Sequence, residues 1–234
     1  LQNGLTQTHQ NNMGAFGGPD IITDGLVLAL DAGSERSYPG TGTSWYDLSD
    51  SGYTHSLIGS PAHTTIDGVV CFNMTSGGYA EPASSTYTFG SNYTYMAWAR
   101  PLSDASATTW RTLWRTTPND HPILIEDGTN LIGLYDNGGS LFNSFGINVG
   151  TIGIENEWTL FTLVGSSGTT TIYINGTDYT ASVSVTISGN SHDVIGAAGT
   201  SQPFGYVANT MIYNRSLTAA EILQNYNAQK NRFI

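Results

Sequence analysis

A single segment of the chain has a helical pattern, and it directly follows a stretch that alternates like a strand. Thr218 and Glu221 have the spacing of a capping box, in which each side chain bonds a backbone N–H at the start of a helix. Ile222, Leu223 and Tyr226 then fall on one side of the helix, and Gln224, Asn225 and Asn227 are expected to face water. The other apolar segments are short, rich in β-branched and aromatic residues, and bounded by turn residues. The chain is therefore predicted to be all-β with one short C-terminal helix.

About a dozen such strands follow one another at short spacing, which is typical of a two-sheet antiparallel jelly-roll sandwich. We place this domain at residues 21–234. Residues 1–20 are rich in Gln, Asn, Thr and Gly and have too few apolar side chains to fold alone. They are predicted to form either a flexible tail or an arm that becomes ordered against a partner, with Met13 or Phe16 as the buried contact.

Charge and composition exclude several classes of function. The net charge is −11 with only seven basic residues, which argues against nucleic acid as a partner because that affinity is built from Lys and Arg contacts. No apolar run approaches the roughly 20 residues that a membrane span needs. Cys71 is the only cysteine, so the fold holds no internal disulfide.

Three segments together resemble one known family. They are MIYNRSLTAAEI near the C-terminus, EWTLFTLVGSSGTTTIYINGT at 157–177, and TDGLVLALDAGSERSYPGTGTSWYD at 23–47. Their order is similar to that of laminin-G-like domains of the concanavalin A type, and the segment 23–47 resembles the opening of the copies in structural proteins of tailed bacteriophages, especially those of cyanobacteria. The resemblance implies a concanavalin A-like jelly roll.

Carbohydrate binding is the chemistry that the residues favour. Aromatic rings can cover the apolar faces of sugars, and loop amides can bond their hydroxyls. The glycan-binding candidates are Trp45, Trp110, Trp114, His121, Tyr135 and Tyr206, although an aromatic residue in a sandwich is more often part of the core. Members of this family are reported to bind calcium, for which Asp136 and Asn137 are candidate ligands because calcium takes six to eight oxygens. Hydrolase activity is not expected, since no strand carries acidic residues at alternate positions as glucanases of this fold do.

The fold does not fix the function. The choice between functions depends on the absence of catalytic carboxylates, metal-ligand clusters and basic patches, and on the presence of a polar N-terminal arm and an acidic composition. The leading hypothesis is a non-enzymatic virion protein of a tailed bacteriophage, a capsid decoration or a tail or fibre component, that forms homo-oligomers, contacts other virion proteins and binds host-surface glycans. The alternative is a secreted or cell-surface carbohydrate-binding module, with or without calcium as a cofactor.

Overall fold

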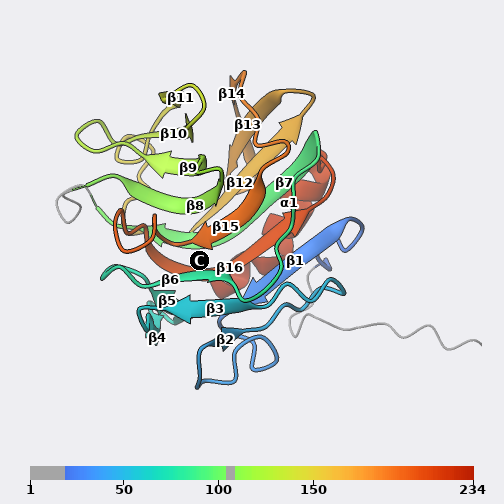
Figure 1. Cartoon of the computed structure of the whole chain (residues 1–234), viewed down its shortest axis with the longest axis vertical. Coiled ribbons are helices and arrows are strands. Elements are labelled where there is room, and N and C mark those ends of the chain that lie inside the picture. The colour runs from blue at the N-terminus through green and yellow to red at the C-terminus, as the bar shows by residue number, and fades with distance from the viewer. Residues whose placement is uncertain (1–18, 104–108) are drawn as a thin grey trace, which may run out of the picture.

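The computed structural model describes residues 19–103 and 109–234, in which two antiparallel sheets pack face to face beside one short helix (Figure 1). The predicted fold class, an all-β sandwich with a single short C-terminal helix, is confirmed. The predicted arm contacts, Met13 and Phe16, lie outside the described residues.

Sheet A is built around two long neighbouring strands. In spatial order its strands are β14 (Thr177–Val183), β13 (Thr169–Ile174), β12 (Thr159–Ser166), β7 (Asn92–Pro101), β16 (Gly205–Tyr213), β5 (Val69–Asn73) and β4 (Ala62–Ile66), with β1 (Leu26–Asp31) paired to β16. Strand β7 is buried along most of its length because both faces of sheet A are covered.

Sheet B forms the other layer of the sandwich. Its strands in spatial order are β11 (Leu141–Asn148), β10 (Leu131–Asp136), β9 (His121–Ile125), β8 (Arg111–Thr117), β15 (Ser191–Ile195), β6 (Tyr79–Pro82), β3 (His55–Ile58) and β2 (Ser44–Trp45). The strand pairs in both sheets are antiparallel, as the predicted jelly roll requires.

Alternation along β7 divides its side chains between two apolar clusters. Tyr95, Ala97 and Ala99 point into the core between the two sheets, where they meet residues of sheet B such as Leu113. Met96 and Trp98 point the other way, as the sequence pattern predicts for this strand. Sheet A therefore has a second core on its outer face.

Helix α1 (Ala219–Gln229) and the short 3-10 helix η1 (Lys230–Arg232) cover that outer face. The predicted capping box is present, with Thr218 as the N-cap and Glu221 bonding back to it. Ile222 is fully buried, and the ring of Phe233 stacks on Trp98 at 4.2 Å. Burying one such side chain stabilises a fold by about 1.5–3 kcal/mol, so docking on sheet A is what stabilises a helix this short.

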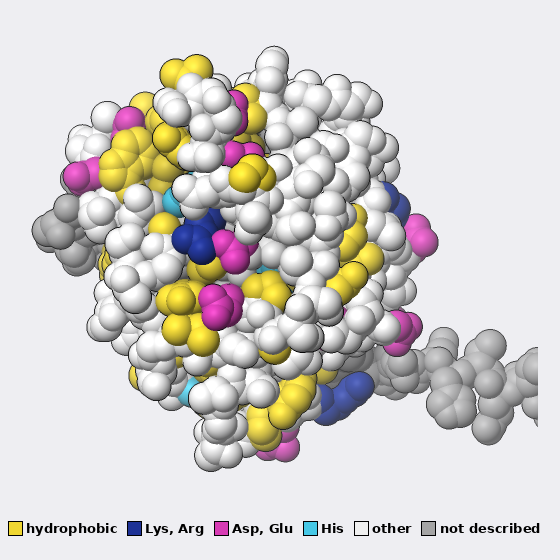
Figure 2. Space-filling model, viewed as in Figure 1, with side chains coloured by type: hydrophobic (Ala, Val, Ile, Leu, Met, Phe, Trp, Pro, Cys, Tyr) yellow, Lys and Arg dark blue, Asp and Glu magenta, His cyan; other side chains and the backbone are white. Residues whose placement is uncertain are grey.

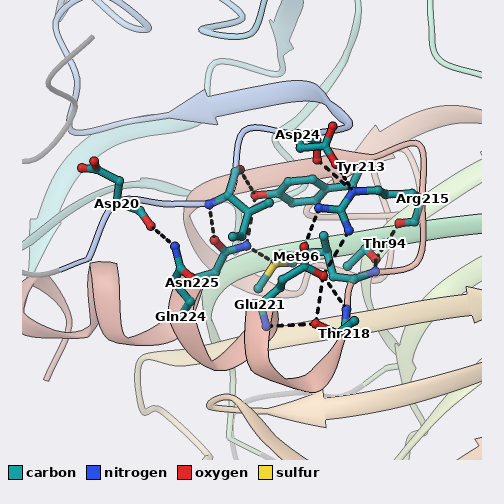
Figure 3. A network of polar contacts seen from close by, with 12 residues as sticks. Asp20, Asp24, Thr94, Met96, Tyr213, Arg215, Thr218, Glu221, Gln224 and Asn225 are labelled. Carbon is teal, nitrogen blue, oxygen red and sulfur yellow. Dashed lines mark hydrogen bonds and ion pairs between the residues drawn. The ribbon is translucent and has the colours of Figure 1, made fainter. Parts of the chain in front are cut away.

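Polar contacts tie the first described residues to the same helix (Figure 3). Asn225 accepts a hydrogen bond from the backbone N–H of Ile22 at 2.7 Å and donates to the hydroxyl of Tyr213 at 3.0 Å. The carbonyl of Asp20 accepts one from Gln224 at 2.8 Å. The prediction that Asn225 faces water is wrong, because the backbone N–H of Ile22 and the hydroxyl of Tyr213 supply polar partners at a buried position.

Candidate functional site

A pocket of about 320 Å³ opens on the outer face of sheet B, the face turned away from sheet A. Figure 2 shows hydrophobic side chains gathered where Figure 1 places β9, β10 and β11, with acidic side chains close beside them. The described residues that line the pocket are Trp110, Asn119, His121, Leu124, Tyr135, Asn137 and Gln202. They come from β9 and β10, the loops at both ends of β8, the turn after β10, and the loop between β15 and β16.

Irregular strand pairing creates this arrangement. Thr112 pairs with Leu124, whereas Trp114 pairs with Ile123, so β8 has one residue more than β9 between these two pairs. Such a bulge breaks simple alternation. As a result Leu113 and Trp114 both lie in the inter-sheet core, while Leu124 lines the pocket.

A glycine in β10 makes room for the aromatic wall of the pocket. The ring of Phe142 lies directly over Gly133, and a Cβ atom added to this glycine would be 2.3 Å from Cε2 of the ring. Phe142 in turn packs edge to face against Trp110, with 5.2 Å between the ring centroids. Any larger residue at position 133 would displace Phe142 and with it the support of Trp110.

His121 occupies a fixed place at the base of the pocket. Its Nδ1 atom lies 2.9 Å from the hydroxyl of Thr112, and its ring meets Tyr135 edge to face at 5.8 Å. The same hydroxyl donates to the side-chain oxygen of Gln202 at 2.7 Å. Burial, and secondarily the charge of Arg115, lower the pKa of His121 to about 4, so the ring is neutral at neutral pH.

Asp120 holds two of the loops around the pocket together. One carboxylate oxygen accepts from the backbone N–H of Asn137 at 2.8 Å, and the other accepts from the side chain of Asn190 at 2.5 Å. The Asn137 amide also donates to the carbonyl of Pro118 at 3.1 Å. The turn that carries Asn137 is thereby fastened to the loop that carries Asn119. Together with the aromatic wall, this gives a concave site with apolar surface and a few fixed polar groups, as small-molecule sites require.

The structure brings four of the predicted site residues into this one pocket, namely Trp110, His121, Tyr135 and Asn137. The prediction is wrong for Trp45 and Trp114, whose exposed fraction is 0%. Trp114 is turned inward by the bulge described above, and Trp45 packs against Phe72 in the inter-sheet core. Tyr206 also lies elsewhere, since it packs on the second core of sheet A and beneath the guanidinium of Arg100.

The predicted calcium ligands do not fit a metal site. Asp136 uses a carboxylate oxygen to accept from the backbone N–H of Gly138, and the side chain of Asn137 is held as a donor. Within residues 19–103 and 109–234, no group of three or more His, Cys, Asp or Glu side chains could hold an ion. Asp136 and Asn137 offer three side-chain oxygens between them, one of which already accepts from Gly138, and calcium takes six to eight.

Three lining residues, Asn119, Leu124 and Gln202, were not predicted from the sequence. Asn119 neighbours the predicted His121 in the chain and has a φ of 92°, a conformation that Asn adopts more readily than most residues. Gln202 has no comparable signal. It reaches the pocket because the backbone N–H of Thr112 bonds its carbonyl at 3.0 Å, a contact between segments about ninety residues apart.

Comparison with known families identifies the class of protein. A laminin-G-type model, described as the concanavalin A-like lectin/glucanases superfamily, matches residues 74–223. The chain belongs to this superfamily, and the predicted laminin-G-like domain is confirmed at that level. No curated protein matches the sequence.

Solved structures show the same fold at low sequence identity. A Trypanosoma rangeli sialidase in complex with sialic acid matches with a TM-score of 0.60 and 15% identity over 89% of this chain. One mutant of a protein designated HCR/D matches with a TM-score of 0.61 and 16% identity over 90% of this chain. This chain spans 34% of the sialidase and 53% of the HCR/D chain. Within the described residues, no helix is long and apolar enough to cross a membrane.

Proposed function

We propose that this chain is a non-enzymatic carbohydrate-binding domain whose ligand occupies the pocket on the outer face of sheet B. One observation carries the proposal: Trp110, His121, Tyr135 and Asn137 come from separate strands and loops and converge on one pocket. Membership of a superfamily of lectins and glucanases supports carbohydrate as the ligand class. The aromatic rings would cover the apolar face of a sugar, and the ring nitrogen and amides would bond its hydroxyls.

A binding role is preferred to hydrolysis because of the chemistry of the lining. Glycosidases flank the scissile bond with a pair of carboxylates. The described residues that line this pocket include no Asp or Glu. The nearby carboxylate of Asp120 has both oxygens engaged with Asn137 and Asn190, so it holds loops in place.

A glycan array followed by calorimetry tests the binding site. We expect Tyr135→Ala and Trp110→Ala each to weaken binding of an array hit at least about tenfold, the effect of losing about 1.4 kcal/mol of contact. Tyr179→Ala is the matched control, because Tyr179 is an exposed tyrosine on β14 of the other sheet and should leave affinity unchanged. Wild-type protein that binds no glycan, or binding that survives both pocket substitutions, would refute the proposal.

We further propose that this domain serves on the particle of a tailed bacteriophage, as a capsid decoration or a tail or fibre component. The support is the resemblance of the segment 23–47 to the opening of phage copies of the family. A mass-spectrometric census of purified virions tests this placement. Absence of the chain from particles whose genome encodes it would favour the alternative, a secreted or cell-surface module.

A further inference from the structure

We propose that the pocket selects neutral sugars, because His121 presents a fixed hydrogen-bond acceptor to a sugar hydroxyl and the lining offers no cation to a carboxylate. This inference rests on the proposed carbohydrate-binding function and specifies its ligand class. Two independent features carry it: the direction of the hydrogen bonds beneath His121, and the distribution of charge around the pocket.

The direction of the hydrogen bonds follows from counting protons. The hydroxyl of Thr112 has one proton, which it donates to the side-chain oxygen of Gln202, an atom that only accepts. Thr112 must therefore accept from His121, so Nδ1 of the imidazole carries its proton. In a neutral imidazole the other nitrogen, Nε2, is then unprotonated and can only accept.

Nε2 is the nitrogen left for a ligand. No hydrogen bond joins it to any residue in the described part of the chain, whereas Nδ1 is engaged beneath the pocket. The Tyr135 edge and the Thr112 hydroxyl together fix the plane of the ring. Burial keeps the ring neutral at neutral pH, which preserves the lone pair on Nε2. A sugar hydroxyl can donate to this atom, and an ionised carboxylate cannot.

The charges around the pocket disfavour an acidic ligand. The described lining residues are all uncharged, and the segment 104–108 contains no Lys or Arg. Two carboxylates flank the site in the chain, since Asp120 lies between Asn119 and His121, and Asp136 lies between Tyr135 and Asn137. The cation that acts on His121 is Arg115, which donates to Asp193 at 2.8 and 2.6 Å and is thereby neutralised as a pair.

The ligand class that fits is a neutral hexose or N-acetylhexosamine with a free hydroxyl at the position facing His121. The volume of about 320 Å³ is at the low end of the roughly 300–1,000 Å³ typical of small-molecule sites, which suits one or two sugar rings. The sialidase that shares the fold binds an acidic sugar, but at 15% identity its ligand does not transfer to this pocket.

Matched sugar pairs test the selection. The protein is titrated with two pairs of sugars, methyl glucoside against methyl glucuronide and methyl galactoside against methyl galacturonide. In at least one pair the neutral sugar should bind at least about tenfold more tightly, a difference in binding free energy of about 1.4 kcal/mol. Equal or tighter binding of the acidic members would overturn the inference while leaving carbohydrate binding intact. Absence of binding by any sugar would remove the proposed function itself, and this inference with it.

The tautomer of His121 is a second readout that needs no ligand. Long-range proton–nitrogen NMR spectra of the full chain should show His121 protonated at Nδ1, and protonation at Nε2 would overturn the inference. Thr112→Val removes the hydroxyl and should mix the tautomers and weaken the preferred sugar about threefold to tenfold, while Thr112→Ser keeps the hydroxyl and should behave as the wild type. If the valine variant does not fold, the tautomer of His121 in the wild-type protein still tests the inference.

Discussion

Two buried histidines and a tyrosine form a directed chain of hydrogen bonds between the sheets. Nδ1 of His55 lies 2.8 Å from the carbonyl of Tyr53, which can only accept, so this nitrogen carries the proton. Nε2 of His55 therefore accepts from Nε2 of His192 at 2.9 Å. That leaves Nδ1 of His192 to accept from the hydroxyl of Tyr95. Each donor has one acceptor, and adding a proton to either ring would set two donors against each other.

The hydrogen bonds through His55 and His192 predict that the protein loses stability in mild acid. Burial lowers the pKa of His55 and that of His121 to about 4 each, and burial, with His55 second, lowers the pKa of His192 well below its ordinary value. The unfolded chain binds protons at these residues below about pH 6.5, while the folded state does not, so their stabilisation is complete above pH 6.5 and is lost as the pH falls toward 4. We expect the free energy of unfolding in urea to drop by roughly 1–2 kcal/mol per buried histidine between pH 7.5 and 5.

The control for this measurement is His63→Gln, since His63 is exposed and the substitution should leave the pH profile unchanged. Removing the pair in His55→Leu/His192→Phe should reduce the pH dependence of the free energy of unfolding to the part that His121 contributes. A wild-type free energy of unfolding that stays constant from pH 7.5 to 5 would contradict the argument.

At the residue scale, the sequence could nominate individual side chains but not their exposure. Trp110 and Trp114 look alike in the sequence, and only the bulge in β8 sends one to the pocket and the other to the core. The bonding of Thr112 to Gln202 is equally hidden, because it depends on the path of the loop before β16. Tyr135 could be nominated because it lies at the end of an apolar run next to a glycine-rich turn.

At the scale of elements, the helix was the most predictable part of the chain because its start is encoded locally. The Arg215 guanidinium bonds Glu221 at 2.6 and 3.1 Å and, with Thr218, holds the pKa of this carboxyl at about 2. The face that the helix buries was only partly predictable. The prediction that Leu223 shares the buried side is wrong, since it is 47% exposed, whereas Asn225 is buried because Ile22 bonds it there.

Adjacent residues of α1 test whether the helix is docked. Ile222→Asp should destabilise the protein by about 2–4 kcal/mol, because it places an unpaired charge in the core on the outer face of sheet A. For a protein of this size, the melting temperature should fall by about 2–4 °C for each kcal/mol lost from the free energy of unfolding. Leu223→Asp is the matched control, an equal change one residue along at an exposed position, and should shift melting by little. Similar melting of both variants would show that α1 is not docked.

At the scale of the whole molecule, contacts distant in the sequence decide where the domain begins. Ile21 and Ile22 pack on the second core, and the hydroxyl of Tyr213 donates to the carbonyl of Ile22 at 2.9 Å. Both residues precede β1, and the backbone N–H of Ile22 bonds to Asn225 of α1. Composition predicts a boundary near residue 20, but it does not reveal that Asn225 and Tyr213 bond Ile22.

Two truncations that differ by five residues test this boundary and the role of the arm. Deletion of residues 1–18 should leave the melting temperature unchanged, because it keeps Ile21 and Ile22 and the hydrogen bonds of Ile22 to Asn225 and Tyr213. Deletion of residues 1–23 also removes Ile21 and Ile22 and leaves Asn225 and Tyr213 without their backbone partners. The longer deletion should therefore cost at least about 2 kcal/mol, since each unsatisfied buried group costs roughly 1–3 kcal/mol. Equal melting of the two variants would place the start of the folded domain after residue 23.

The shorter deletion also separates folding from assembly. A polar segment with few apolar side chains gains little by folding on its own domain, so we propose that residues 1–18 are ordered by a neighbouring copy or by another virion protein. Light scattering should then show oligomers for the full chain and monomers for the shortened one, and incorporation into particles should fail while the array hit still binds the sheet B pocket. Replacing only Met13 and Phe16 by serine should reproduce the loss if these two residues make the contact. Normal oligomers and normal incorporation after deletion would show that the arm is a tail, and would favour a free-standing carbohydrate-binding module.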